Sequence, residues 1–293
     1  MKLEDLILLI LRLSIALIVF TLGLGATFAD AVYLFRRPAK LARAFFSMNV
    51  LMPAVALLLV FQFDLDPAVK IALGALSASP VPPFFPKSAL KEGGKENYTI
   101  GLLVATSLLA IVVIPLTMAI FGKIAGVPLS MSPGTVAAKV FKIVLLPLLL
   151  GVGVRRVVPS FAQAAAKPVG TVATLLLVLG VLPLLFVQSR AIFSLFGNGT
   201  LLSLSAFAGI GLIAGYWLGG PEPANRRVLG IATASRHPGL AVAMAQANFP
   251  QQKLALSAVG LYVIISVLLS ALFYRLIVRT GAASAETNRR AAA

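Results

Sequence analysis

Charged residues are scarce in this sequence. They make up 12% of the 293 residues, whereas soluble domains usually carry about 25%. Apolar residues make up 59%, and the mean hydropathy is +1.00. So little charge cannot cover the surface of a soluble protein of this length, because the exposed apolar patches would aggregate. A soluble globular fold is therefore excluded.

Cysteine is absent, histidine occurs once, and acidic residues number nine. The absence of cysteine excludes disulfide bonds, thiol catalysis and cysteine metal sites. No acidic residue falls in the middle of a long apolar run, so the usual acid–base, metal and nucleophilic constellations cannot be assembled. We expect no enzymatic activity and no cofactor, although a lone serine or lysine nucleophile stays open.

The sequence does contain nine apolar stretches of roughly 20 residues, the length of helix that crosses a hydrocarbon core. Lipid offers no partner to unpaired backbone groups, so these stretches must be helices. The predicted fold class is an all-α polytopic membrane protein of about nine transmembrane helices. One transmembrane unit would fill residues 1–280, and the Ala-rich, polar residues 281–293 would form a disordered cytoplasmic tail. The predicted segments are 6–28, 41–62, 67–91, 98–121, 135–157, 167–189, 200–219, 226–249 and 251–278.

Basic residues give a net charge of +16 and gather in short connections between the apolar stretches. This distribution argues against nucleic-acid binding and is typical of orientation signals that face anionic lipid headgroups. Every second connection is basic, beginning with the one that carries Arg36, Arg37, Lys40 and Arg43. The positive-inside rule then places the N-terminus outside and the C-terminus in the cytoplasm. We expect a cell membrane, as in a bacterial inner membrane.

Two of the nine segments are interrupted near their middle. Segment 67–91 contains four prolines between Pro80 and Pro86, and segment 226–249 contains an Arg-His-Pro-Gly run that begins at Arg236. Proline removes an amide donor and clashes with the preceding turn, so neither segment can be one continuous helix. The two breaks are five segments apart, and an odd offset inverts topology. We therefore predict inverted repeats whose two discontinuous helices cross at a transporter binding site.

Three uncharged polar residues lie in or near the membrane segments: Asn49, Gln188 and Asn248. Polar side chains in bundles of membrane helices commonly form hydrogen bonds between helices. We expect that role for these three residues rather than ligand binding.

Six stretches of the chain carry a family resemblance: Phe20–Leu24, Leu34–Pro38, Leu51–Leu57, Phe141–Gly151, Gly215–Gly219 and Ile231–Phe249. Together, and in this order, they resemble the bile acid:sodium symporter family of the bile/arsenite/riboflavin transporter superfamily. The resemblance implies a panel domain and a core domain. It also implies that two discontinuous helices of the core cross near the middle of the membrane, beside the substrate.

The chain departs from this family where the resemblance places the sodium ligands. The family's first crossover ends in a Ser-Asn pair, whereas Pro82–Lys87 read Pro-Pro-Phe-Phe-Pro-Lys. In the second crossover, Ala232 stands at the family's Glu position, and Arg236 and His237 stand at its Gln-Asn pair. A further sodium-binding Gln corresponds to Met48. Sodium prefers several hard oxygen ligands, so we expect both sodium sites to be absent.

Arg236 is the strongest candidate for binding a substrate. A charge near the bilayer centre costs at least about 2.5–3.5 kcal/mol on insertion scales and is rarely idle. Arg236 would pair with an anionic substrate, or act as a fixed charge that replaces sodium and binds carbonyls freed by the break. Lys87 is a second cation, unless it extends to the headgroups. The predicted substrate-binding residues are Arg236, His237, Lys87, Phe85, Ser235 and Pro238, with no metal ligand.

Two of these residues have alternative roles. His237 has a reference pKa near 6.5, so it is a candidate for proton coupling, but it also suits a neutral packing or hydrogen-bonding role. Phe85 would line an apolar cavity or pack in the protein interior.

The function that we expect is secondary transport of a small organic anion by alternating access, without sodium and with either proton coupling or none. Two alternatives stay open. One is a sodium:organic anion symporter whose ion ligands lie elsewhere in the chain. The other is a non-transporting membrane receptor on the same fold, in which Arg236 and Lys87 hold the crossover in place. The expected partners are the anion and the lipid bilayer.

Overall fold

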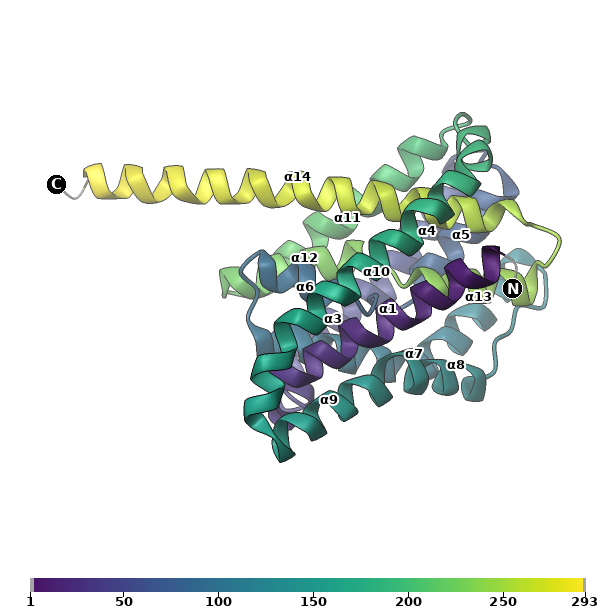
Figure 1. Cartoon of the computed structure of the whole chain (residues 1–293). Helices are drawn as coiled ribbons and strands as arrows, with labels where there is room; N and C mark the ends of the chain where they lie inside the picture. The colour runs from purple at the N-terminus through teal and green to yellow at the C-terminus, as the bar shows by residue number, and fades with distance from the viewer. Residues whose placement is uncertain (1–2, 292–293) are drawn as a thin grey trace.

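The computed structural model describes residues 3–291, with side chains for residues 6–277. Over this range the chain is helical and contains no strand (Figure 1). Seven apolar helical segments are long enough to cross a membrane, and two further segments are interrupted as predicted. In chain order the elements are α1 Leu3–Gly25, α2 Phe28–Ala31, α3 Pro38–Phe45, the π-helical segment η1 Phe46–Leu51, α4 Met52–Gln62, α5 Pro67–Ala78, α6 Phe85–Lys91, α7 Glu96–Ala125, α8 Pro133–Val140, the π-helical segment η2 Phe141–Leu145, α9 Leu146–Val157, α10 Pro159–Ser194, α11 Thr200–Leu218, α12 Pro223–Ala234, α13 Pro238–Asn248 and α14 Leu254–Ala291.

One layer of the molecule, the panel, consists of α1, α10 and the continuous segment α8–η2–α9. In this layer α1, α9 and α10 pack side by side (Figure 1). Glycines allow the closest approach of α1 to α9. A Cβ atom on Gly23 would lie 2.3 Å from the carbonyl oxygen of Leu148, and one on Gly151 would lie 2.3 Å from that of Phe20. Small residues of this kind let the backbones of membrane helices touch.

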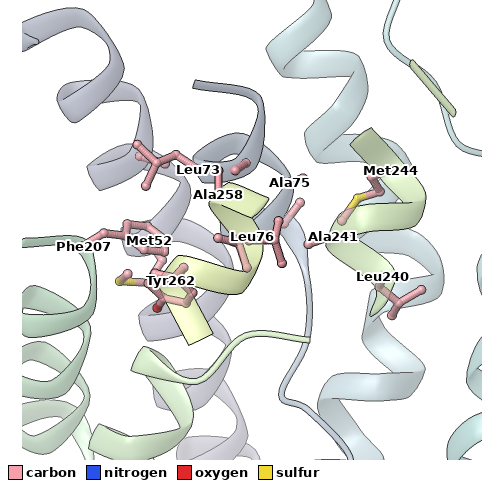
Figure 2. Packing of buried hydrophobic residues seen from close by; sticks show 14 of the residues in the cluster. Met52, Leu73, Ala75, Leu76, Phe207, Leu240, Ala241, Met244, Ala258 and Tyr262 are labelled. Carbon is pink, nitrogen blue, oxygen red and sulfur yellow. The ribbon is translucent and has the colours of Figure 1, made fainter. Parts of the chain in front are cut away.

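The remaining long helices form the core. Its largest apolar cluster includes Met52 of α4, Leu73 of α5, Phe207 of α11, Leu240 of α13 and Tyr262 of α14 (Figure 2). The short helices α5 and α13 contact each other inside this cluster. Each is too short to span a bilayer alone, and the packing around them holds their broken ends within the protein.

The contacts of the two interrupted segments repeat each other. Helix α5 packs against α4, α7, α13 and α14, while α12 packs against α11, α14, α6 and α7. The second set follows from the first when each helix is replaced by the one five membrane segments away. Helix α4 is replaced by α11, α7 by α14, α13 by α6 and α14 by α7. Helices α6 and α13 follow the same rule, because α6 contacts α7 and α13 contacts α14. The inverted-repeat arrangement predicted from the two breaks is therefore present in the packing.

Large apolar side chains are exposed on the outside of the bundle. Phe61, Phe186 and Trp217 are each more than 70% exposed. Water would not tolerate so many exposed apolar groups, whereas lipid tails would. The protein is a multi-pass membrane protein.

Three of the connections meet at one end of the core. Glu222, before α12, accepts hydrogen bonds from Lys40 Nζ at 2.7 Å and from Lys95 Nζ at 2.6 Å. These two ammonium groups hold the pKa of the Glu222 carboxyl at about 2, below its ordinary value of 4.5. The three connections therefore share one side of the molecule, as the alternation of basic connections predicts. That this side is cytoplasmic stays a prediction.

The C-terminal part of the chain differs from the sequence-based expectation. Helix α14 continues to Ala291 and projects beyond the rest of the bundle, where a disordered tail was predicted for 281–293 (Figure 1). Alanine is the strongest helix former, and residues 282–291 are rich in it, which accounts for the continued helical backbone. Residues 292–293 lie outside the described part.

Candidate functional site

The candidate site is the crossing point of the two breaks. Helix α5 ends at Ala78, and its following residue Ser79 is extended. Helix α12 ends at Ala234, and Ser235 is extended in the same way. The backbone N–H of His237 donates to the carbonyl oxygen of Pro80 at 2.8 Å. One break thus supplies a donor and the other an acceptor, so the two interrupted segments are joined where each lacks its own helical partner.

Arg236 is buried in this crossing, with 2% of its surface exposed. Its Nη1 donates to the carbonyl oxygen of Ser79 at 3.0 Å, and its Nη2 donates to that of Met48 at 2.9 Å. Ser79 caps the end of α5, and Met48 lies in the π-helical segment η1. A buried charge needs polar partners, and both partners here are backbone dipoles. Arg236 therefore links the second break to the first break, through Ser79, and to the π-helical segment η1, through Met48.

The walls of the crossing are also hydrogen-bonded. Ser47 Oγ and Thr233 Oγ1 lie 2.8 Å apart, which links η1 to α12. The hydroxyl of Tyr262 on α14 donates to the carbonyl oxygen of Ala234, the last residue of α12. Both contacts hold the end of α12 beside Arg236.

His237 caps the next helix. Its Nδ1 accepts a hydrogen bond from the backbone N–H of Leu240 at 3.3 Å. An accepting Nδ1 carries no proton, so this contact requires the neutral imidazole with its hydrogen on Nε2. Lys139 of the panel helix α8 is close enough to interact electrostatically with His237. The geometry suits the hydrogen-bonding role of His237 that the sequence offered as its second interpretation.

Phe85 is buried against Val81, Tyr98 and Ala232 in the apolar interior. It packs in the core and does not line either pocket described below, so the geometry fits its packing interpretation. Ser235 and Pro238 are half-buried at the edge of the second break.

Lys87 lies elsewhere. Its Nζ donates to the carbonyl oxygen of Gly170 at 3.2 Å and to the hydroxyl of Thr174, both on panel helix α10. The sequence grouped Lys87 with Arg236, but the structure turns it away from the crossing and toward the panel. Lys87 directly follows Pro86, the last proline of the cluster, in the first turn of α6.

The sequence that forms the panel and the first break matches a known family. A family model described as the sodium bile acid symporter family matches residues 12–195, which is more than half of the chain. The chain belongs to the sodium bile acid symporter family. The match includes the first break and ends before the second, so Arg236 lies outside it. No curated protein matches the sequence.

The residues that the sequence resemblance assigns to the sodium positions include Met48, Ala232 and Arg236, and the structure places them at or beside the crossing. Met48 and Ala232 are buried apolar residues, and the guanidinium of Arg236 uses the carbonyls of Met48 and Ser79. Among the described residues, no three His, Asp or Glu side chains lie close enough together to hold a metal ion.

A pocket of about 350 Å³, the Lys87 pocket, lies between α6 of the core and the panel helices α1 and α10. Its polar lining comes from Lys87, Lys167, Thr21 and Thr171 together with Gly170, and its apolar lining includes Ile18, Leu22 and Leu90.

A second pocket of about 340 Å³, the Gln188 pocket, lies between the other end of α10 and the helices α13 and α14. At its edge, Ser257 Oγ of α14 donates to Gln188 Oε1 of α10 at 2.8 Å. The sequence-based prediction that Gln188 bonds between helices is confirmed. Asn248, at the end of α13, instead accepts from the backbone N–H of Ser130, in the connection between α7 and α8, at 2.8 Å.

Sequence reasoning missed the panel side of the site. This side consists of Lys139 on α8 and of Lys167, Gly170 and Thr174 on α10. None of these residues interrupts the apolar pattern of its helix as strongly as the two breaks interrupt theirs. Lys139, four residues into the predicted segment 135–157, was the available signal, because lysine inside a membrane segment is costly.

Proposed function

We propose that this protein is a secondary carrier for a small organic anion that works by alternating access and does not use sodium. The observation that supports the absence of sodium coupling is the pairing of Arg236 with the carbonyls of Ser79 and Met48. A cation built into the protein already occupies these oxygens. No movable cation is needed to hold the crossing together.

A sodium ion beside this guanidinium would also be repelled. Two unit charges about 4 Å apart interact by about 4 kcal/mol at the effective dielectric constant of protein sites near a surface, and by more in a drier interior. The sequence resemblance assigns the family's carboxylate position to Ala232, which offers no negative charge to offset that repulsion. Arg236 therefore takes the place of the coupling ion rather than helping to bind one.

Transport is supported by the family and by the placement of the two pockets. Both pockets lie between core and panel, and both are lined by α10. Gly170 and Gln188 are 18 positions apart in this helix, which is about 27 Å at about 1.5 Å per residue. That distance approaches the thickness of the hydrocarbon layer, about 30 Å. This spacing supports access to one pocket from each side of the membrane, as alternating access requires.

The alternative with its own supporting observation is a non-transporting receptor. The two breaks are joined by His237 and by Arg236, and a crossing held this way would resist motion. In a carrier, the core moves as a unit against the panel and these contacts stay intact. Flux of a bound anion into liposomes separates the two functions, because a receptor binds the anion and carries none.

The sodium test compares thermal unfolding of the purified protein in NaCl, KCl and choline chloride at fixed ionic strength. A ligand that binds only the folded state raises stability by RT ln(1 + [L]/Kd). We expect the same unfolding temperature in all three salts. A rise specific to sodium would contradict the proposal and favour a sodium:organic anion symporter.

A further inference from the structure

We propose that Lys87 is the charge-recognition residue for the transported anion, and that binding of the anion's carboxylate or sulfonate releases Lys87 from α10 and frees the core from the panel. This inference rests on the proposed function. It assigns a site, a ligand class and a trigger for domain motion to the Lys87 pocket.

The lining of the Lys87 pocket selects an anion with a small apolar body. Two lysines and two threonines line one cavity, and the lining includes no acidic residue. Ile18, Leu22 and Leu90 provide the apolar part. A volume of about 350 Å³ is at the small end of ligand pockets, which run from about 300 to 1,000 Å³. A molecule the size of an aromatic or short aliphatic acid fits these limits.

Among the residues with described side chains, two hydrogen-bonded side chains join a core helix to the panel helix α10, and each lies at one pocket. Lys87 of α6 donates to Gly170 and Thr174 on the first side, and Ser257 of α14 donates to Gln188 on the second. Opening either pocket by moving the core against the panel must break the contact on that side. The Lys87 contact is the one whose donor carries a charge.

An anion in the Lys87 pocket competes for that donor. The present acceptors of Lys87 Nζ are a neutral carbonyl and a neutral hydroxyl, and Thr174 Oγ1 already donates to Gly170 O at 2.6 Å. A carboxylate or sulfonate forms a charge-assisted bond that is roughly twice as strong. When Lys87 turns to the anion, Gly170 and Thr174 still satisfy each other. The hydrogen bonds of Lys87 to the panel are then lost at little cost.

The experiment uses the full chain in nanodiscs of phosphatidylcholine. Because the chain lacks cysteine, Ser88→Cys on α6 and Gln163→Cys on α10 introduce a single pair for spin labels, and their distance reports core against panel. The probes are phenylacetate, hexanoate and benzenesulfonate, with phenylacetamide and phenethylammonium as neutral and cationic analogues. We expect the anions alone to bind and to shift the distance distribution.

Three variants separate charge recognition from general damage. Lys87→Met should weaken anion binding at least tenfold and show the shifted distance without ligand. Thr174→Val removes an acceptor but keeps the charge, so it should shift the distance and still bind the anion. Lys91→Met, on the same helix one turn beyond Lys87 and outside the pocket lining, should behave like the unmodified protein.

The inference is wrong if no anion binds more tightly than its neutral or cationic analogue, or if Lys87→Met binds anions like the unmodified protein. A distance change caused by adding phosphatidylglycerol to the nanodisc, with no effect of the free anions, would also overturn it, because a lipid headgroup would then be the ligand. These readouts do not depend on flux or sodium. An absence of uptake, or a sodium requirement, would refute the proposed function without changing these binding and distance readouts, so the two failures are distinguishable.

Discussion

At the scale of the residue, Arg236 combines two properties that seldom meet. It is buried deep in a membrane protein, and its guanidinium donates to the carbonyls of Ser79 and Met48 rather than to a carboxylate. The carbonyls are available because one belongs to a helix end and the other to a π-helical segment. The irregular backbone of the crossing therefore supplies acceptors for the buried charge of Arg236, and Arg236 supplies donors to those carbonyls.

Replacing Arg236 tests this relation. In Arg236→Met, both carbonyls lose their donor, and each unsatisfied buried group costs about 1–3 kcal/mol. We expect a lower unfolding temperature in detergent. We also expect a sodium-specific rise in stability that the unmodified protein lacks, because the freed carbonyls become ligands for a small cation.

Two further variants control for charge and for position. Arg236→Lys keeps a cation but presents a single point charge that cannot reach both carbonyls in the same geometry, so it should lie between the unmodified protein and Arg236→Met in stability. Arg190→Ala, at an exposed position of α10, should change neither stability nor its response to sodium. Equal stability of Arg236→Met and the unmodified protein would show that the two bonds contribute nothing.

At the scale of the element, the sequence allowed the nine segments and both breaks to be predicted because they depend on local rules. Lipid demands apolar runs of fixed length, and four prolines within seven residues interrupt any helix. The direction of Lys87 was not predictable in this way. It follows from how α6 leaves the first break and where α10 lies, and both are matters of packing between distant segments.

The contact between α1 and α9 offers a test at this scale. A Cβ on Gly151 would lie 2.3 Å from the carbonyl oxygen of Phe20, so Gly151→Ala must push the two helices apart. We expect it to destabilise the protein by about 1–3 kcal/mol, the usual cost of overpacking.

The matched control is Gly153→Ala, two residues further along α9, where an added Cβ meets nothing within 4 Å. It should be neutral or stabilise the protein by up to about 1 kcal/mol, since alanine is the better helix former. Thermal unfolding of both variants in the same detergent measures the difference. Equal effects at the two positions would mean that the close approach of α1 and α9 is not required.

At the scale of the whole molecule, Lys40, Lys95 and Glu222 bring three connections together, and the positive-inside rule predicts that this side is cytoplasmic. Single cysteines test the orientation. Lys253→Cys, before α14, should react with a membrane-impermeant maleimide in intact cells. Lys91→Cys, at the end of α6, should react only after the membrane is opened. The reverse pattern would show that the chain is inserted the other way round.

A counter-charge that belongs to the protein has an energetic consequence for the carrier. Sodium that travels with an anion cancels its charge, but Arg236 stays with the crossing when the anion leaves. Each anion carried without a proton would then move one net negative charge across the membrane, and each 100 mV of membrane potential contributes about 2.3 kcal/mol per charge. In a cell whose interior is negative, that energy favours outward movement. In a carrier of the proposed kind, a fixed arginine in place of a travelling ion would thus turn the electrical gradient into a driving force for export.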